Sequence, residues 1–600
     1  MVTKKSIGDV RPSQLITTFG PGAIVDLQTV SIIVAGIDEW HPEDTEPIKE
    51  PRLQQALGVN KFYAPKPVEG GNFYSKRGTV PAYLFPRYQV CPVCHTLSEV
   101  GEGHTKYDAK WCEIKCTAPN CKGKGKVRAT TLPSPFIVAC EAGHLDDFPF
   151  REYVHRGKSC NKRLFLKSSG RTGTITDIYV ECSCGDKRPM GDAFGEKRGE
   201  VFSECSRRRP WLGPKNRDKG HCNHNDTVRA MQRGATNVWF PMVRSALAIK
   251  EVATPIGRAI TECDQKQIAK IDSIEKLTTL IEMEMFPLLE EFPAEQVWHS
   301  IQKMRGEIET DETDLRWPEW QAFRNPAEAS NENADLFLEE GEVPEKYTAL
   351  IKRIVLARKL LEVRALIGFT RIDSLSSITD SGDVPDIAPI YRNKPDWLPA
   401  VEVRGEGIFI ELNEEEVASW EGKDAVKRRA KAMADKYSEW EAQRKKPHDN
   451  FSSGRFILLH TLAHALIRQL SLDCGYSASS VRERIYCSDD PERLMCGILL
   501  YTAAADSEGS LGGLVDLGSP ARFPELFEGA LISMLRCSSD PLCADHQPDV
   551  HATINGAACH ACALVSETSC EAFNRFLDRN VIVPTMAHSD IAFFPDPLSS

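Results

Sequence analysis

Residues 555–570 read NGAACHACALVSETSC and hold three cysteines and one histidine within sixteen residues. Such density is typical of a metal site, of a dithiol redox pair, or of a cysteine-rich composition without a site. The positions of the other seventeen cysteines help to distinguish these three interpretations. Twelve of the twenty lie from Cys91 to Cys263 and eight from Cys474 to Cys570, with none in the 210 residues between. This uneven distribution predicts two separate zinc-bearing regions.

The composition favours metal binding over disulfides. The 41% hydrophobic and 26% charged content is that of a soluble globular protein. No apolar segment follows the charged start MVTKKSIGDVRPSQL, and no apolar run approaches the roughly 18 residues of a transmembrane helix. We therefore expect a cytoplasmic protein without a membrane partner. In a reducing cytosol, clustered cysteines are more often metal ligands or catalytic groups than disulfides.

Charge is distributed unevenly along the chain. The net charge is −11, but residues 91–230 hold 25 Lys+Arg against 17 Asp+Glu. Residues 307–345 hold 13 acidic residues and two arginines. A basic module joined to an acidic body indicates either a face for nucleic acid or the solvated surface of a zinc ribbon.

We divide the 600 residues into five parts, since about three or four domains are expected for this length. The parts are an N-terminal α/β segment (1–90), a basic cysteine-rich zinc module (91–230), a helical connector (231–305), an acidic linker or insertion (306–347) and a C-terminal domain (348–600) with a zinc-binding segment at about 450–585. The expected fold is a mixed α/β (α+β) multidomain protein: a zinc-ribbon-like N-terminal module plus a C-terminal α/β domain with a cysteine-rich zinc site.

Hydrophobic periodicity places the main elements. We expect strands at 31–37 and 407–412, helices across 250–305 and 413–447, an amphipathic helix at 346–369, and an apolar helix at 456–475 that ends at Gly475. No GxxxxGK[ST] motif occurs, so the glycine-rich stretch at 17–27 is expected to be a turn and not a phosphate loop.

The most regular cysteine spacing begins at CPVC. Cys91 and Cys94 are separated by two residues, which lets both thiolates bind one ion. Cys116 and Cys121 supply a second half, and Cys112 competes for one of these places. The sequence therefore predicts a zinc ribbon.

Cations surround the second half of this ribbon. They lower the pKa of the thiols and leave a basic surface for phosphates. We expect DNA contacts from two groups of cations: Lys115, Lys122, Lys124, Lys126 and Arg128, and then Arg207, Arg208 and Arg209.

A less regular set follows and could bind one or two further ions. It comprises Cys140, His144, His155, Cys160, Cys182, Cys184, Cys205, Cys222 and His224. One grouping takes Cys182, Cys184, Cys205 and Cys222; another takes Cys140, His144, His155 and Cys160. The alternative is that several of these cysteines are small buried hydrophobic residues.

The stretch EAGHLDDFPF places His144 near Asp146 and Asp147. These residues fit a general-base cluster, a histidine ligand with supporting carboxylates, or a plain helix N-terminus, and we favour the last two.

Five thiols near the C-terminus compete for a site that normally takes four ligands. Cys543, Cys559 and Cys562 are expected to bind one zinc ion, with either Cys537 or Cys570 as the fourth ligand. A redox role for CHAC lacks the short βαβ context of thioredoxin-like proteins.

His460 and His464 share one face of the apolar helix, as the two histidines of a metalloprotease do. Position 461 is threonine, so the glutamate base of HExxH is missing, and we expect both histidines to be core residues. No complete catalytic motif is found, and we expect no enzymatic activity. The alternatives are a metal-dependent hydrolase or nuclease and a stand-alone zinc-ribbon DNA-binding protein.

Several long stretches of the chain are distinctive. They are SQLITTFGPGAIVDL, CPVC, FIVACEAGHLDDFPF and MQRGATNVWFP in the first half, and LLHTLAHALIRQLSLDCGYSASSVRERIY, ILLYTAAADSEGSLGGL, CSSDPLC and GAACHACALVSETSCEAFNRFLDR in the second. Together they resemble the DrmB family of the DISARM phage-defence system. The resemblance covers nearly the whole chain, with 306–347 its least distinctive part.

The resemblance implies a non-catalytic partner of a superfamily 2 helicase of the DrmA type. The two would form a DNA-binding core that acts with a methyltransferase and a phospholipase-D-like protein against phage DNA. It also implies a C-terminal MrfA-type zinc-binding domain whose four cysteines correspond in order to Cys537, Cys543, Cys559 and Cys562. Here CHAC replaces the GCPxC of the related helicases. The lack of a Walker motif fits a partner that hydrolyses the ATP.

Overall fold

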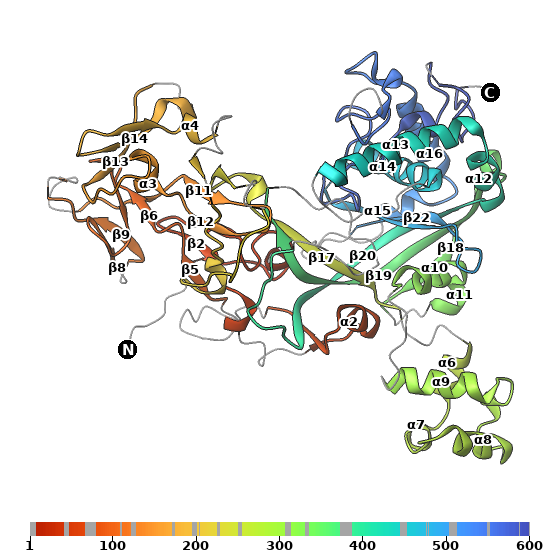
Figure 1. Cartoon of the computed structure of the whole chain (residues 1–600). Coiled ribbons are helices and arrows are strands. Elements are labelled where there is room, and N and C mark those ends of the chain that lie inside the picture. The colour runs from red at the N-terminus through yellow and green to blue at the C-terminus, as the bar shows by residue number, and fades with distance from the viewer. Residues whose placement is uncertain are drawn as a thin grey trace.

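A computed structural model provides the structure of the chain. It describes residues 8–40, 47–65, 80–108, 111–119, 121, 128–170, 174–194, 201–202, 204–224, 228–249, 255–305, 314–330, 335–372, 387–443, 453–475, 477, 479–502, 513–548, 553–586 and 588–598. Within these residues, no helix has both the length and the apolar character needed to cross a bilayer. The chain is a mixed α/β protein in several parts, as the sequence predicts (Figure 1).

A largely antiparallel sheet forms the centre of the molecule. Its main path runs β17-β19-β20-β22-β21, with β18 also on β19 and the β3–β4 pair on β20. The strands are β3 (Pro47–Ile48), β4 (Lys61–Tyr63), β17 (Phe240–Leu247), β18 (Phe337–Glu340), β19 (Ile351–Thr370), β20 (Trp397–Leu412), β21 (Val481–Ser488) and β22 (Met495–Thr502).

Helices lie on both sides of this sheet. Figure 1 shows α13, α14 and α16 over one face, with α10 and α11 near the opposite side. The helices of this region are α10 (Arg316–Arg324), α11 (Pro326–Ala329), α12 (Glu414–Glu421), α13 (Asp424–Gln443), α14 (Gly454–Cys474), α15 (Gly513–Leu517) and α16 (Phe523–Leu535).

Helix α14 is the central helix of the largest core. Residues 457–467 are buried throughout, so the helix is apolar on all sides and packs on β21, β22 and α16. It ends at Gly475, whose φ of 66° is the left-handed conformation that glycine adopts at helix ends. The predicted helix and its end are confirmed.

The prediction of an amphipathic helix at 346–369 is wrong, because this segment is strand β19. Alternate residues of β19 enter two different cores: Ile354 and Leu356 pack beneath α14, whereas Val355 and Ala357 pack against α10. A strand buried on both faces is a nearly continuous apolar run, which periodicity alone does not distinguish from a buried helix.

The described residues of the acidic segment 306–347 are not all an exposed linker. Phe323 of α10 stacks on Phe409 of β20, with ring centroids 4.5 Å apart and an interplanar angle of 8°. Glu319 is fully buried and accepts a bidentate hydrogen bond from Arg484, at 2.6 Å to each oxygen. The aromatic side chains of WPEWQAF therefore outweigh the acidic composition of this part.

Small sheets build the N-terminal part. The first has the order β1-β2-β5, the second β10-β6-β7-β13-β14-β15, the third β12-β11-β16, and β8 and β9 form a hairpin. Their bounds are β1 (Ile24–Asp26), β2 (Ser31–Val34), β5 (Ala82–Leu84), β6 (Tyr88–Val90), β7 (Thr96–Glu99), β8 (Thr105–Asp108), β9 (Glu113–Cys116), β10 (Leu132–Pro133), β11 (Phe136–Ala139), β12 (Leu145–Asp147), β13 (Leu164–Ser168), β14 (Ile178–Cys182), β15 (Lys187–Pro189) and β16 (Arg229–Gln232).

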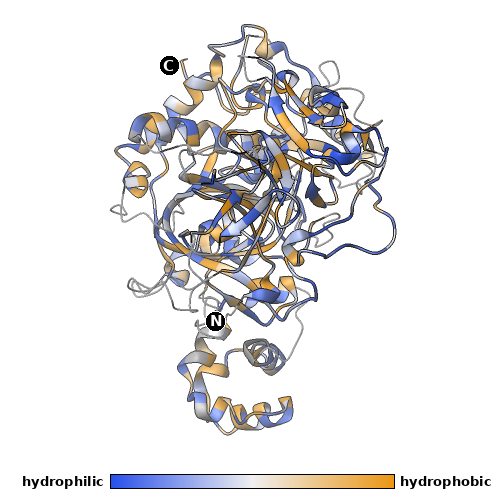
Figure 2. Cartoon of the chain, turned by 90° about the vertical axis from the view of Figure 1, so that its left-hand side faces the viewer, coloured by the Kyte–Doolittle hydropathy of each residue, from blue (hydrophilic) through white to orange (hydrophobic). Residues whose placement is uncertain are grey.

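Short helices join these strands, and a separate helical unit follows them. The short helices are α1 (Gln14–Thr17), α2 (Pro51–Leu57), α3 (Phe150–Val154) and α4 (Gly191–Phe194). The helical unit comprises α6 (Pro255–Glu262), α7 (Gln265–Ile268), α8 (Ile274–Glu282) and α9 (Ala294–Arg305), and it has its own small core. It lies at the lower end of the molecule in Figures 1 and 2. The expected helices at 250–305 are thus present.

Candidate metal centres

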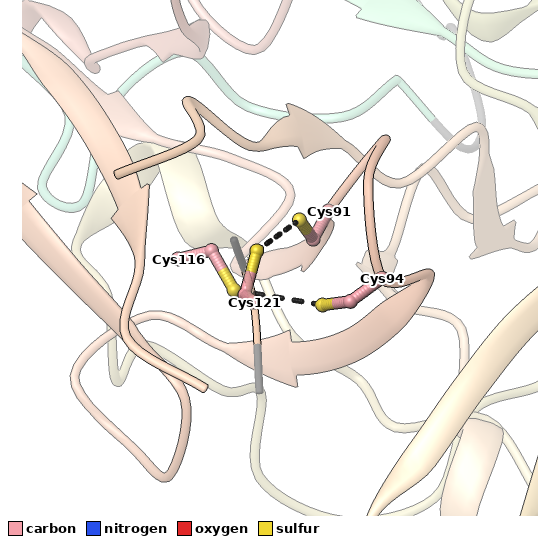
Figure 3. Close-up of side chains that lie close together, drawn as sticks. All are labelled: Cys91, Cys94, Cys116 and Cys121. Carbon is pink, nitrogen blue, oxygen red and sulfur yellow. Dashed lines mark hydrogen bonds between the residues drawn. The ribbon is translucent and has the colours of Figure 1, made fainter. Parts of the chain in front are cut away.

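The CPVC stretch supplies two members of a four-cysteine cluster. Cys91 follows β6 and Cys94 precedes β7, and the turn between them is closed by the His95 amide donating to the Cys91 carbonyl at 2.8 Å. Cys116 ends β9, and Cys121 follows it. The four sulfur atoms face one another, with 3.5 Å from Cys91 to Cys121 and 3.8 Å from Cys94 to Cys116 (Figure 3).

These separations can be compared with those of a zinc site. Four thiolates at 2.3 Å from a tetrahedral zinc ion lie about 3.8 Å from one another, and a thiolate and an imidazole nitrogen lie about 3.5 Å apart. The first cluster fits this geometry. Cys112, the competitor suggested by the sequence, lies outside the cluster.

A second cluster joins Cys140, His144, Cys205 and Cys222, all of them buried. Cys140 and His144 stand on either side of the β11–β12 turn, where Gly143 has a φ of 78°. His144 Nδ1 lies 3.4–3.5 Å from each of the three sulfur atoms, as zinc geometry requires. Hydrogen bonding with Cys140 lowers the pKa of the Cys205 thiol to about 4 and that of the Cys222 thiol to about 6, which favours the thiolate form that binds zinc.

The other ring nitrogen of His144 is held by a carboxylate. Nε2 donates to Asp218 at 2.9 Å, and Asp218 in turn accepts from Arg209 at 2.7–2.9 Å. This contact fixes the tautomer that presents the Nδ1 lone pair to the three sulfur atoms. A metal-ligating histidine typically has such a partner.

A third cluster joins His155, Cys160, Cys182 and Cys184. His155 follows α3; its Nδ1 donates to the Arg151 carbonyl at 2.7 Å, so Nε2 is left to face Cys184 Sγ at 3.4 Å. Cys182 ends β14, which pairs with β13, and its Sγ lies 3.8 Å from Cys160 Sγ. Both groupings suggested by the sequence are therefore wrong, because each mixed members of the second and third clusters.

The C-terminal cluster consists of Cys537, Cys543, Cys559 and Cys562, with sulfur atoms 3.6–3.7 Å apart. Hydrogen bonding with Cys562 lowers the pKa of the Cys543 thiol to about 5. Of the two candidates for the fourth position, the structure brings in Cys537. Cys570 lies elsewhere, beside His460.

The three residues of a possible general-base cluster are not brought together. Asp146 pairs with Arg208 at 3.0 Å, and Asp147 accepts the amide hydrogens of Arg87 and Tyr88. Burial raises the pKa of Asp147 to about 7. The carboxylate that supports His144 is Asp218, which sequence proximity does not reveal because it lies 74 residues away.

The cations proposed for DNA binding fall into three groups. Arg208, Arg209 and Lys115 already pair with carboxylates, the last with Glu113. Arg207 is half-buried, and Arg128 is exposed while donating to the Ala118 carbonyl at 3.1 Å. The remaining three lie outside the described residues: Lys122, Lys124 and Lys126.

Similarity to known proteins identifies the family of this chain. Residues 11–240 match a domain of unknown function, DUF8724, and residues 462–563 match the MrfA Zn-binding domain. The DISARM protein DrmB of Bacillus paralicheniformis is 33% identical over 587 residues, which are 94% of this chain and 98% of that protein. The chain belongs to the DrmB family of DISARM proteins.

A solved structure is also similar in part. The DUF1998 helicase MrfA bound to DNA is 12% identical and matches 36% of this chain and 22% of its own, with a TM-score of 0.17. The zinc-binding match includes all four cysteines of the C-terminal cluster and stops short of Cys570. The matched domain and the geometry of the four clusters are compatible with zinc as the cofactor.

Proposed function

We propose that this chain is a non-catalytic, zinc-stabilised subunit of a cytoplasmic DISARM core complex that binds a DrmA-like superfamily 2 helicase and helps to bind DNA. Its family membership supports the place in DISARM. The helicase and DNA are the partners that the family resemblance implies.

The number of ligands in each cluster carries the non-catalytic part of the proposal. Each cysteine-rich cluster in the described residues offers four protein ligands to one ion. Structural zinc sites are filled in this way, whereas catalytic zinc keeps a position for water or substrate. The clusters would therefore hold short loops and small sheets together, because structural zinc contributes folding energy directly.

The β8–β9 hairpin is the surface that we propose contacts DNA. Its connecting loop contains Trp111, which is 59% exposed, and Tyr107 on β8 is 45% exposed. Lys106 on the same hairpin is exposed, and so is Arg128 beyond it. Exposed aromatic rings stack on bases, and cations contact phosphates, so this combination suits a single strand or an opened duplex.

Co-purification tests the helicase part. The full chain is co-expressed with the DrmA-like helicase of a DISARM system, and ATP hydrolysis and DNA affinity are compared with those of the helicase alone. We expect a stable complex and a change in at least one of the two activities. Two separate proteins with unchanged activities would contradict the proposal, and so would DNA cleavage by the pure chain.

Salt-dependent binding tests the DNA part. In the complex, Arg128→Ala should reduce the slope of log affinity against log salt by about one unit, because one phosphate contact is lost. Trp111→Ala should weaken binding by about 1–3 kcal/mol without changing the slope. Lys352→Ala, which removes an exposed cation of β19, is the control. If all three variants have the same DNA affinity and the same salt slope, the hairpin is not part of the DNA-binding surface.

A further inference from the structure

We propose that His460, His464, Glu483 and Cys570 form a fifth zinc site, a closed structural centre in the core of the C-terminal domain. This inference is independent of the proposed function. The matched zinc-binding domain, residues 462–563, excludes two of the four residues. Sequence reasoning placed both histidines in the core without a ligand role and left Cys570 as an alternative for the neighbouring cluster.

The four side chains come from three separate parts of the chain and converge. The histidines are on consecutive turns of α14, Glu483 is on β21, and Cys570 is in the segment after the C-terminal cluster. Their ligand atoms all lie within 4.8 Å of one another. The two histidines and Glu483 are 0–2% exposed and Cys570 is 7% exposed.

The separations lie within about 0.4 Å of those expected around a tetrahedral ion. His460 Nε2 lies 3.1 Å from Cys570 Sγ and 3.1 Å from Glu483 Oε1, and His464 Nε2 lies 3.5 Å from Glu483 Oε2. Around zinc, nitrogen–sulfur and nitrogen–oxygen pairs lie about 3.5 and 3.4 Å apart. Imidazole, carboxylate and thiolate are all zinc ligands, and four protein ligands make a closed site.

Hydrogen bonds outside the cluster orient three of the four ligands, and His460 Nδ1 has no such partner in the described part of the chain. The amide of Glu571 donates to Glu483 Oε1 at 2.9 Å. His464 Nδ1 donates to the Ala563 carbonyl at 2.8 Å, so the neutral ring presents its Nε2 lone pair to the centre. The amide of Asn574 donates to Cys570 Sγ at 3.1 Å, as the amide of Arg207 does to Cys205 in the second cluster.

Two polar atoms directed to the centre lack a hydrogen-bond partner in the part of the chain that the structure describes. His464 Nε2 and Glu483 Oε2 are buried and have no hydrogen-bond partner among the described residues. With His464 Nδ1 donating to a carbonyl, a neutral ring aims a lone pair at a carboxylate oxygen, which is repulsive unless a cation lies between them. Unpaired buried polar atoms of this kind are costly.

Charge balance points to a divalent cation. Within the described structure, Glu483 forms no ion pair with a lysine or arginine. A buried carboxylate and a buried thiolate carry two negative charges, which one Zn²⁺ neutralises while the imidazoles stay neutral. The cost of burying uncompensated charge is thereby avoided.

The site would fasten the C-terminal segment at a second point. Cys559 and Cys562 belong to the C-terminal cluster, and Cys570 lies eight residues after Cys562. Between them, Arg468 of α14 donates to the carbonyls of Ala561 and Leu564. A second ion would therefore hold the far end of this segment against α14 and β21.

Anomalous diffraction at the zinc edge tests the proposal on the unmodified full chain. We expect a peak between the four side chains, together with peaks at the four cysteine-rich clusters. Metal analysis should find five zinc ions per chain, and Cys570→Ser should lose one of the five. The matched control is Cys487→Ser, on the same strand as Glu483 but outside all five clusters, which should keep five.

A different distribution of anomalous peaks would overturn the proposal of a fifth zinc site. Peaks at the four cysteine-rich clusters with none at His460 and Cys570 would show a metal-free hydrogen-bond network. If Cys570→Ser does not fold, the map of the unmodified chain decides alone. Neither outcome bears on helicase or DNA binding, so the proposed function and this site fail separately.

Discussion

Replacing Asp218 by asparagine removes the carboxylate that holds His144 in the second cluster. The Nε2–Asp218 contact of 2.9 Å sets the ring tautomer and makes the ligating nitrogen more basic. Loss of such a partner typically lowers metal affinity 10–100-fold. Because Asp218 is 39% exposed, water screens part of its charge, and we expect the lower part of that range. The expected loss is about 10- to 30-fold, or about 1.4–2 kcal/mol.

A chelator titration followed by native mass spectrometry measures this loss. The zinc ions retained per chain are counted at each chelator concentration, and Asp218→Asn should release its first ion at about 10- to 30-fold lower chelator concentration. Asp192→Asn is the control, since Asp192 is 41% exposed, pairs with Arg188 and lies outside the five clusters. Identical curves for Asp218→Asn and the unmodified chain would refute the role given to Asp218.

Two buried ion pairs, one between α10 and β21 and one within β19, give further predictions. Glu319→Ala should destabilise the chain by about 3–5 kcal/mol in chemical denaturation, because Arg484 is left buried without its partner; Glu342→Ala, at an exposed position, should change stability by less than about 0.5 kcal/mol. Burial alone would raise the pKa of Glu362, but the charge of Arg364 at 2.6 Å lowers it to about 2. The stabilisation, about 3 kcal/mol, is complete above pH 4.5 and is lost as the pH falls through 2. Hydrogen exchange of β19 amides should show this loss in the unmodified chain and not in Glu362→Gln; equal pH profiles would contradict it.

The local spacing of the cysteines was sufficient to predict the first zinc cluster. Cys91 and Cys94 share one turn, and Cys116 and Cys121 are close in sequence, so their convergence needs few long-range contacts. The apolar helix α14 was also predictable, because its length and its terminal Gly475 are local signals.

The other sites depend on strand pairing that the spacing does not encode. The β13–β14 pairing lies beside the contact between Cys160 and Cys182, and Asp218 reaches His144 across 74 residues. The partners of His460 and His464 required β21 and the C-terminal segment to be in place. Strand β19 was mistaken for a helix because burial on both faces removes the alternation that marks a strand.

Intact native mass spectrometry of the zinc-loaded chain tests the central claim most directly, namely that four cysteine-rich clusters each hold a structural zinc ion. The account predicts at least four ions on every folded chain, with five if the site at His464 and Glu483 is filled. Removing the ions with chelator should unfold the cysteine-rich module. A folded chain that carries fewer than four zinc ions would contradict the account.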